Sequence, residues 1–166
     1  MKLTIGPLVR SVALIAMTVT TFSAGYADKT VDEKGFIRLK AGQEVWTYYP
    51  NSTWQFMVIE GDPKKPGPYV LRYKVPAREM STPHFHPEDR FITVIQGTWW
   101  TGIGETFDPD NMIALAPGSF MKHPAGGAHF VGSKDGEVIV QVVGIGPSGL
   151  TSVHPEMGIS IKYQGK

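Results

Sequence analysis

The chain has 166 residues, 42% hydrophobic and 19% charged, which is enough for one packed domain and too ordinary a composition for a disordered protein. A formal net charge of +1 gives no reason to expect nucleic acid or an anionic membrane surface as a partner. The absence of cysteine excludes disulfides, thiolate zinc sites and cysteine nucleophiles.

The N-terminus is typical of an export signal. Lys2 and Arg10 supply positive charge, an apolar run follows at 12–22, and small residues stand at the cleavage positions before Asp28. We therefore expect residues 1–27 to be a signal peptide, and the mature protein to be periplasmic or secreted and free of the membrane. The alternative is an uncleaved N-terminal anchor, although the apolar run is short for a membrane-spanning helix.

The mature chain is predicted to be all-β. Residues 28–44 are polar and are expected to form an N-terminal arm with one short strand at 36–39; residues 45–166 are expected to form a single β-domain. Glycine and proline number 19 and 13, which indicates many turns, and no stretch has a helical apolar period. Residues 76–83 are expected to be a connection, and the tail after residue 150 to contain one or two weak strands. Strands are predicted at 45–49, 53–61, 69–75, 90–96, 98–104, 112–115, 119–123, around residue 129 and, most clearly, at 137–146.

Three histidines mark the candidate site. His84 and His86 are two residues apart, so in an extended segment their imidazoles point to the same face and can share one ion. His129 follows about forty residues later in the glycine-rich segment 124–130. The chemistry of the protein is expected where these three side chains meet.

These segments resemble the cupins, which are small jelly-roll β-barrels defined by two short motifs. His84, His86 and Gly97 match the first motif, a His-x-His pair with a closing glycine. Pro124, Gly126 and His129 match the second motif, while the Asn position of that motif falls on Ser133. The resemblance implies a cupin-type jelly-roll barrel and extends over most of the mature chain.

The resemblance also implies that His84, His86 and His129 bind one divalent transition metal ion, which can be Fe, Zn, Mn, Ni or Cu. Most metal-binding cupins have a carboxylate ligand where this chain has Arg90, and a guanidinium has no lone pair to give. If Arg90 points inward, it opposes the metal charge or binds an anionic substrate. If it points outward, the metal has three protein ligands and open positions.

Three further residues are catalytic candidates: Glu88, Arg90 and His123. Glu88 is the nearest carboxylate that could replace the missing ligand, although a residue in such a turn is more often solvated. His123 either faces the cavity or lies at the surface. Gln141, in the apolar segment 137–146, points either to a sheet edge or into the cavity.

Two functions remain open at this point. The first is a mononuclear metal enzyme that acts on a small molecule, of the dioxygenase or the isomerase and lyase type. The second is a non-catalytic periplasmic module that binds a metal or a small ligand. The partners expected are a small-molecule ligand or substrate and, since cupins often pair through their sheets, a second copy in a homodimer.

Overall fold

The computed structural model describes residues 29–165, so the predicted signal peptide at 1–27 lies outside the described residues. Within 29–165 no helix is long and apolar enough to cross a bilayer. The helical structure described consists of two short 3-10 turns, Pro109–Asn111 and Pro155–Met157. The prediction of an all-β fold is therefore confirmed.

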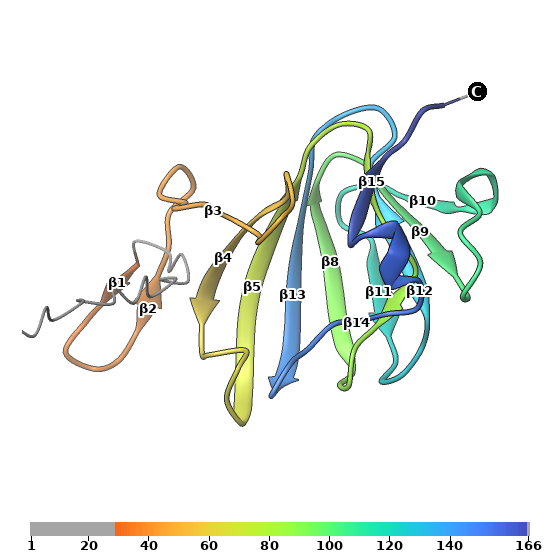
Figure 1. The fold of residues 1–166 in the computed structure, drawn as a ribbon. Coiled ribbons are helices and arrows are strands. Elements are labelled where there is room, and N and C mark those ends of the chain that lie inside the picture. The colour runs from red at the N-terminus through yellow and green to blue at the C-terminus, as the bar shows by residue number, and fades with distance from the viewer. Residues whose placement is uncertain (1–28, 166) are drawn as a thin grey trace, which may run out of the picture.

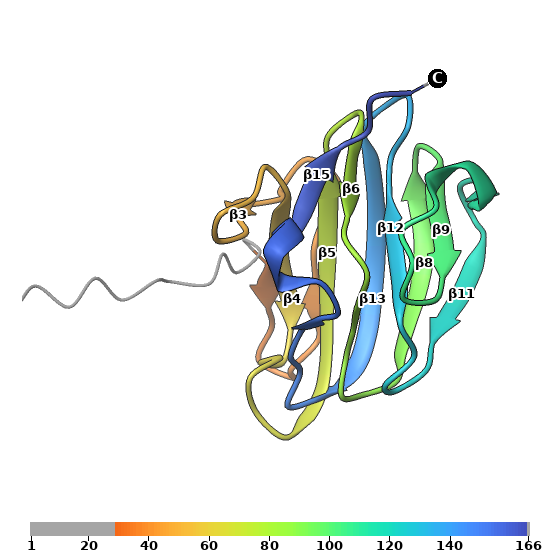
Figure 2. The same ribbon diagram turned by 45° about the vertical axis from the view of Figure 1, so that its right-hand side comes forward.

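Two antiparallel sheets face each other (Figures 1 and 2). The first has six strands in the spatial order β11 (Phe120–His123), β8 (Arg90–Gln96), β13 (Val138–Gly146), β5 (Gly67–Val75), β4 (Gln55–Glu60) and β3 (Thr47–Tyr48). The second has seven, with β10 (Ile113–Leu115), β9 (Trp99–Ile103), β12 (His129–Gly132), β6 (Glu79–Ser81) and β15 (Ser160–Lys162) in order, and with β7 (His84–Phe85) joining β12 to β14 (Thr151–Ser152). A separate hairpin pairs β1 (Thr30–Val31) with β2 (Ile37–Arg38).

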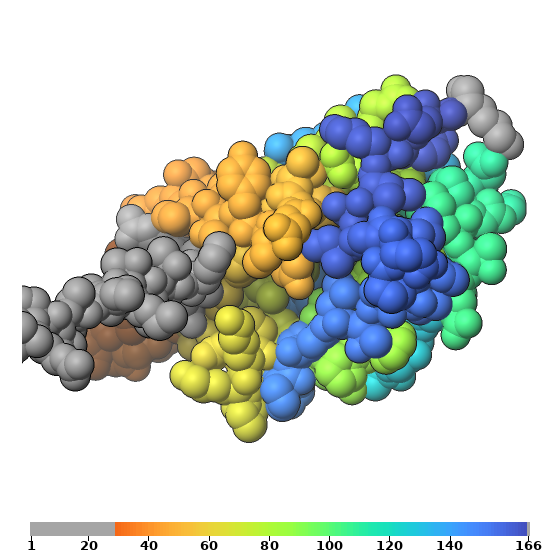
Figure 3. Space-filling view, in the orientation of Figure 1, coloured from red at the N-terminus to blue at the C-terminus, as the bar shows by residue number. Residues whose placement is uncertain are grey.

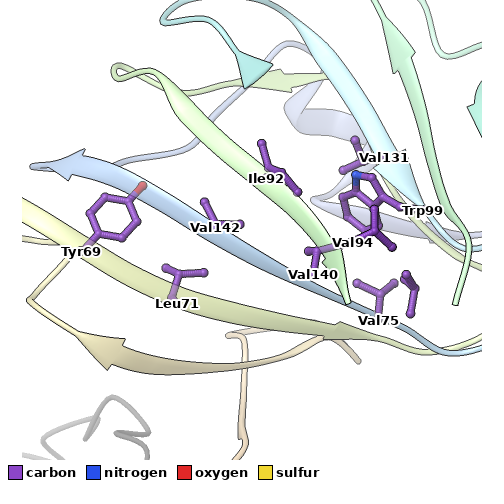
Figure 4. Packing of buried hydrophobic residues seen from close by; sticks show 10 residues of the cluster. Tyr69, Leu71, Val75, Ile92, Val94, Trp99, Val131, Val140 and Val142 are labelled. Carbon is purple, nitrogen blue, oxygen red and sulfur yellow. The ribbon is translucent and has the colours of Figure 1, made fainter. Parts of the chain in front are cut away.

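The core lies between these sheets because the central strands alternate in burial. In β13, for example, Val138, Val140 and Val142 are buried and the residues between them face away. Figure 4 shows Val140, Val142 and the buried side chains of β5 and β8 on one face of the sheet, opposite Trp99 and Val131 of the second sheet. This is the two-residue period expected of strands that cover one core face.

Strand β6 was not predicted. Residues 76–83 were expected to be a connection, but Glu79–Ser81 forms β6, pairs with β12 and β15, and is completely buried. The segment is flanked by Pro76 and Pro83 and has no alternating apolar pattern, so nothing local indicates a strand. The buried carboxylate of Glu79 is compensated by Lys162 of β15 at 2.9 Å, which means that the C-terminal tail makes this strand possible.

Gly97 closes the turn between β8 and β9 for a conformational reason. Its φ is +73°, a region that favours glycine, and a Cβ there would lie 2.3 Å from the carbonyl oxygen of Glu137. The glycine of the first motif therefore allows β8 and β9 to cross from one sheet to the other beside the β12–β13 connection.

Gly132 allows β12 to lie close to β6. A Cβ at this position would be 2.3 Å from the backbone oxygen of Glu79 and 2.6 Å from the Cα of Met80. We expect Gly132→Ala to lower the free energy of unfolding by about 1–3 kcal/mol, because the backbone of β6 would have to move. Gly136→Ala is the matched control, since a Cβ at that position would have no other atom within 4 Å. Equal urea midpoints for the two variants would contradict the prediction.

Candidate metal centre

The three motif histidines come together on β7 and β12. His84 lies directly opposite His129 in the register of these two strands, and His86 follows just after β7. Their ring centroids are 4.5 Å apart for His84 and His129, 4.9 Å for His84 and His86, and 5.3 Å for His86 and His129. One nitrogen of each ring lies within 4.8 Å of the others, and all three side chains are buried.

Each ring is oriented by a backbone carbonyl. Nδ1 of His84 bonds to the oxygen of Thr82 at 2.8 Å, Nδ1 of His129 to that of Gly127 at 2.8 Å, and Nδ1 of His86 to that of Gly149 at 2.6 Å. Since a carbonyl only accepts, Nδ1 carries the proton in all three rings and Nε2 keeps its lone pair. Metal-binding histidines are commonly oriented in this way.

The donor set fits a divalent transition metal. Nε2 of His129 is buried and has no hydrogen-bond partner among residues 29–165, so it lacks the partner that an ion would supply. Burial lowers the pKa of His84 to about 3, of His86 to about 2 and of His129 to about 4, so all three are neutral at pH 7. Neutral imidazoles are the ligand form, and iron, copper, nickel and zinc accept them.

A fourth imidazole lies beside this group. His123, at the end of β11, has its ring centroid 3.6 Å from that of His129, and its buried Nε2 has no partner among the described residues. Burial lowers its pKa to about 2. The side chain lines the cavity described below, which decides between the two positions considered for it, but it is not part of the three-nitrogen group.

Arg90 points inward. Its side chain is 9% exposed and lines the cavity, with Nε donating to Oε1 of Glu88 at 2.9 Å and Nη2 donating to Oγ of Ser148. Its charge lies close enough to the imidazoles to lower the pKa of His86, second only to burial. Of the two orientations considered from the sequence, the structure therefore has the one that opposes a metal charge or binds an anion.

Glu88 is neither a ligand nor a solvated turn residue. Its side chain is 9% exposed, it lies outside the histidine group, and it is not on the cavity wall. Tyr69 also donates to its Oε1, at 2.8 Å. Burial acts to raise the pKa of Glu88, but hydrogen bonds from Ser148, Arg90 and Tyr69 outweigh it and leave the pKa below its usual value. Glu88 is thus a buried anion that balances Arg90.

A cavity of about 550 Å³ opens next to the histidines, between the two sheets. The segment around β3 and β4 and the C-terminal segment both line it, and they touch where Oγ of Ser52 lies 3.4 Å from Oγ of Ser160. Figure 3 shows these two segments, orange and dark blue, side by side on this face. The volume is in the range of small-molecule sites.

Gln141 takes no part in the site. It lies on the outer face of β13, opposite the buried Val140 and Val142, and its Oε1 accepts a hydrogen bond from Nε of Arg72 at 3.2 Å. The edge and cavity positions considered from the sequence are both wrong. A central strand can carry a polar residue on its outer face when a neighbouring strand supplies the partner.

No protein-family model matches the chain, and no curated protein matches its sequence. Solved structures do. A cupin-like protein from Thermotoga maritima is 14% identical, with a TM-score of 0.51 over 63% of this chain and 80% of that one. The chain has the cupin fold. The polyketide cyclase RemF from Streptomyces resistomycificus (18% identity, TM-score 0.51, 60% of this chain and 70% of that one) is also similar. The DMSP lyase DddQ from Ruegeria pomeroyi is also similar, with 18% identity and a TM-score of 0.53 over 78% of this chain and 62% of that one.

The cupin motifs located the histidines but not the groups that hold them. Thr82 and Gly127 lie near their histidines in sequence, whereas Gly149 and Ser148 are about sixty residues from their partners His86 and Arg90. A backbone carbonyl leaves no signature in a sequence, and a serine in a loop is too common to be one. These supporting contacts can be found only in the folded cupin barrel.

Proposed function

We propose that this cupin is a metal-dependent enzyme that acts on a small molecule, with chemistry of the isomerase or lyase type. The observation that carries the proposal is the geometry of the histidines: three oriented Nε2 atoms converge at the wall of a cavity large enough for a small substrate. His84, His86 and His129 would hold the ion. Bound there, a divalent ion would supply a Lewis acid that polarises a substrate oxygen or lowers the pKa of a water molecule.

The residues around the triad have separable tasks. Arg90 binds and orients substrate, because it presents a fixed charge to the cavity. His123 holds or moves a proton at Nε2, since this nitrogen is buried, neutral at pH 7 and otherwise unpartnered in the described chain. The apolar walls exclude water from the site.

The isomerase and lyase type is favoured over oxygen insertion by the structural neighbours. One is named a polyketide cyclase and another a DMSP lyase, and both names describe bond rearrangement or cleavage rather than oxygenation. The oxygenase alternative stays open to the identity of the metal, because redox-active iron, manganese, copper or nickel would favour it and zinc would not.

The second candidate function is a non-catalytic module that binds a metal or a small ligand. It is favoured by the position of Glu88, which lies behind Arg90 and away from the cavity wall. Apart from the three motif histidines, His123 is then the only described residue on the cavity wall that can accept a proton and is not already paired with a charged side chain. If metal-loaded protein binds small molecules but turns none of them over, the binding role gains support, whereas turnover that is lost in His123→Gln would exclude it.

The metal can be tested without a known substrate. Protein purified without a histidine tag or chelator should contain about one equivalent of one transition metal, measured by mass spectrometry. Ion at 100 to 1,000 times its Kd stabilises by about 2.7–4.1 kcal/mol, so the Tm should rise by roughly 5–15 °C over chelated protein.

The bound metal and the rise in Tm should both be lost in His86→Ala and in His129→Ala, and both kept in His123→Gln. His123 is the matched control because it is an equally buried histidine on the same cavity. Loss of metal in His123→Gln would make it a fourth ligand. Absence of metal from the wild-type protein, together with no thermal shift on adding divalent ions, would refute the metal site.

We also propose that the protein is exported and forms a homodimer. Lys2, Arg10 and the apolar run at 12–22 support export, which cell fractionation tests. Exposed apolar side chains on the outer face of the six-stranded sheet support pairing: Phe91 and Phe120 stack with centroids 6.4 Å apart and are 40% and 62% exposed. Light scattering at a mass of one chain would contradict the dimer.

A further inference from the structure

The cavity has one buried fixed charge. Three of its lining residues carry a charge at neutral pH, namely Asp62, Lys64 and Arg90, and of these only Arg90 is buried. Asp62 and Lys64 lie in the loop between β4 and β5, where Asp62 is half-buried and Lys64 is exposed. A ligand that enters fully therefore meets a single fixed cation, next to the four imidazoles.

Arg90 has donor capacity left over. Nε bonds to Glu88, and Nη2 bonds to Ser148, whereas no hydrogen bond within residues 29–165 uses Nη1. A guanidinium has five N–H groups in a rigid plane, so two anchored nitrogens fix the direction of the remaining donors. The side chain is thus a pre-oriented donor for an oxygen in the cavity, rather than a charge satisfied entirely by the protein.

The charge balance around Arg90 favours an anion. Glu88 already pairs with Arg90, with Oε1 of the carboxylate 2.9 Å from Nε of the guanidinium. No carboxylate belongs to the candidate ligand group within the described residues, so a divalent ion there would leave two positive charges uncompensated. Buried charge without a counter-charge is costly, and an anionic ligand would remove that cost.

Part of the cavity wall is aromatic. Trp54 packs edge-on against Trp99 and Tyr73, with centroids 6.1 and 6.3 Å away, and Tyr49 continues the series at 6.5 Å from Tyr73. All four line the cavity, and aliphatic side chains of β5, β8 and β13 fill the space between them (Figure 4 shows Leu71, Ile92, Val140 and Val142). The flat faces of these side chains accept an aromatic ring.

We propose that the cavity binds a small aromatic carboxylate, with its carboxylate on Arg90 and its ring against Trp54, Tyr73 and Trp99. The proposal rests on the proposed function in one respect: the carboxylate end of the ligand lies beside the imidazole triad, where the chemistry would occur. It commits to one orientation of the ligand, with the carboxylate on Arg90 and the ring against the aromatic side chains, and so predicts weaker binding of neutral ligands and of ligands without a ring.

The test is calorimetric and needs no turnover. Salicylate serves as the aromatic carboxylate, salicylamide as its neutral counterpart and lactate as a hydroxy acid without a ring. Each is titrated into the full protein, both chelated and zinc-loaded. We expect salicylate to bind about tenfold or more tightly than either of the others, as charge-assisted hydrogen bonds and ring burial require. Equal affinities for salicylate and salicylamide, or for salicylate and lactate, would overturn the proposal.

A charge-balanced variant assigns the effect to Arg90. Glu88→Gln together with Arg90→Gln removes both members of the buried pair, and should abolish the preference for salicylate over salicylamide. The matched control is Glu44→Gln with Arg72→Gln, an ion pair of 3.6 Å outside the cavity, which should keep it. Trp54→Leu is a second variant that leaves the charges alone and should reduce the preference for salicylate over lactate. Preferences unchanged in both cavity variants would also overturn the proposal.

The two proposals fail separately. A chelated protein that prefers salicylate in an Arg90-dependent way, but takes up no metal, would leave the ligand class standing and remove the metal enzyme. A protein that takes up one equivalent of zinc but shows no preference among the three probes would leave the metal site standing and remove the ligand class.

Discussion

Metal-free protein should lose several kcal/mol of stability between pH 6.5 and pH 4. The four imidazoles of the site are each at least nine-tenths buried, and burial is the largest cause of the lowered pKa in every one; they are His84, His86, His123 and His129. An unfolded histidine binds a proton near pH 6.5, whereas the folded pKa values are about 2 to 4. Acid therefore favours the unfolded state.

Proton linkage gives both the direction of this change in stability and the pH range in which it occurs. Above pH 6.5 neither state binds these protons and stability is full; below it, each histidine lowers the free energy of unfolding by up to about 1.4 kcal/mol per pH unit. Carboxylates with lowered pKa values, such as Asp62 and Asp89, contribute only at lower pH, since their ordinary value is 3.8. The histidine loss is thus separable from ordinary acid denaturation.

Urea unfolding of chelated protein at pH 7, 6 and 5 measures this effect. A domain of ordinary stability, about 5–15 kcal/mol, should be close to unfolding near pH 4. The His123→Gln variant carries one buried imidazole fewer, so its stability should fall less steeply with acid. A flat profile between pH 7 and pH 5 in the wild-type protein would mean that the imidazoles are not buried and neutral.

Arg90→Gln should be the most damaging single substitution near the site. It removes one member of a buried ion pair, in which both side chains are 9% exposed, and leaves the carboxylate of Glu88 buried without its cation. Breaking such a pair costs about 3–5 kcal/mol. For a domain of this size the Tm should fall by roughly 6–20 °C.

Adding Glu88→Gln to the Arg90→Gln variant should recover most of the lost stability. Gln at both positions carries no charge, and the hydroxyl of Tyr69, whose pKa is raised by burial to about 12, can still donate to the amide oxygen. Thermal denaturation of the two single variants and the double variant gives the coupling energy directly. If the double variant is as unstable as Arg90→Gln alone, the damage comes from lost packing and not from the unpaired charge.

The fold could be predicted where burial alternates along one strand. β13 was expected at 137–146 and is Val138–Gly146, because its inward valines leave a clear period of two. β6 could not be predicted, because all three of its residues are buried and one of them is Glu79. Its status as a strand depends on pairing with β12 and with the tail, which no local pattern records.

The part of the site that could be predicted is the part whose residues have a characteristic spacing in the sequence. The histidines of the two motifs do meet, because His84 and His129 lie opposite each other on the paired neighbouring strands β7 and β12, and His86 follows two residues after His84. The orientation of Arg90 could not be predicted, because it depends on Glu88, Tyr69 and Ser148, which reach it from different loops and strands. A charged residue turns inward only when such partners are in place.

The hydrogen bond from His86 to the carbonyl of Gly149 has a consequence for the order of events during synthesis. All three candidate ligands lie within the first 129 residues, so a growing chain contains the full set long before it ends. His86 is nevertheless held by a residue that follows β13, the strand that completes the centre of the six-stranded sheet. A nascent chain that stops at β13 has three histidines and only two oriented ones. Orientation of all three rings therefore requires the chain that follows β13.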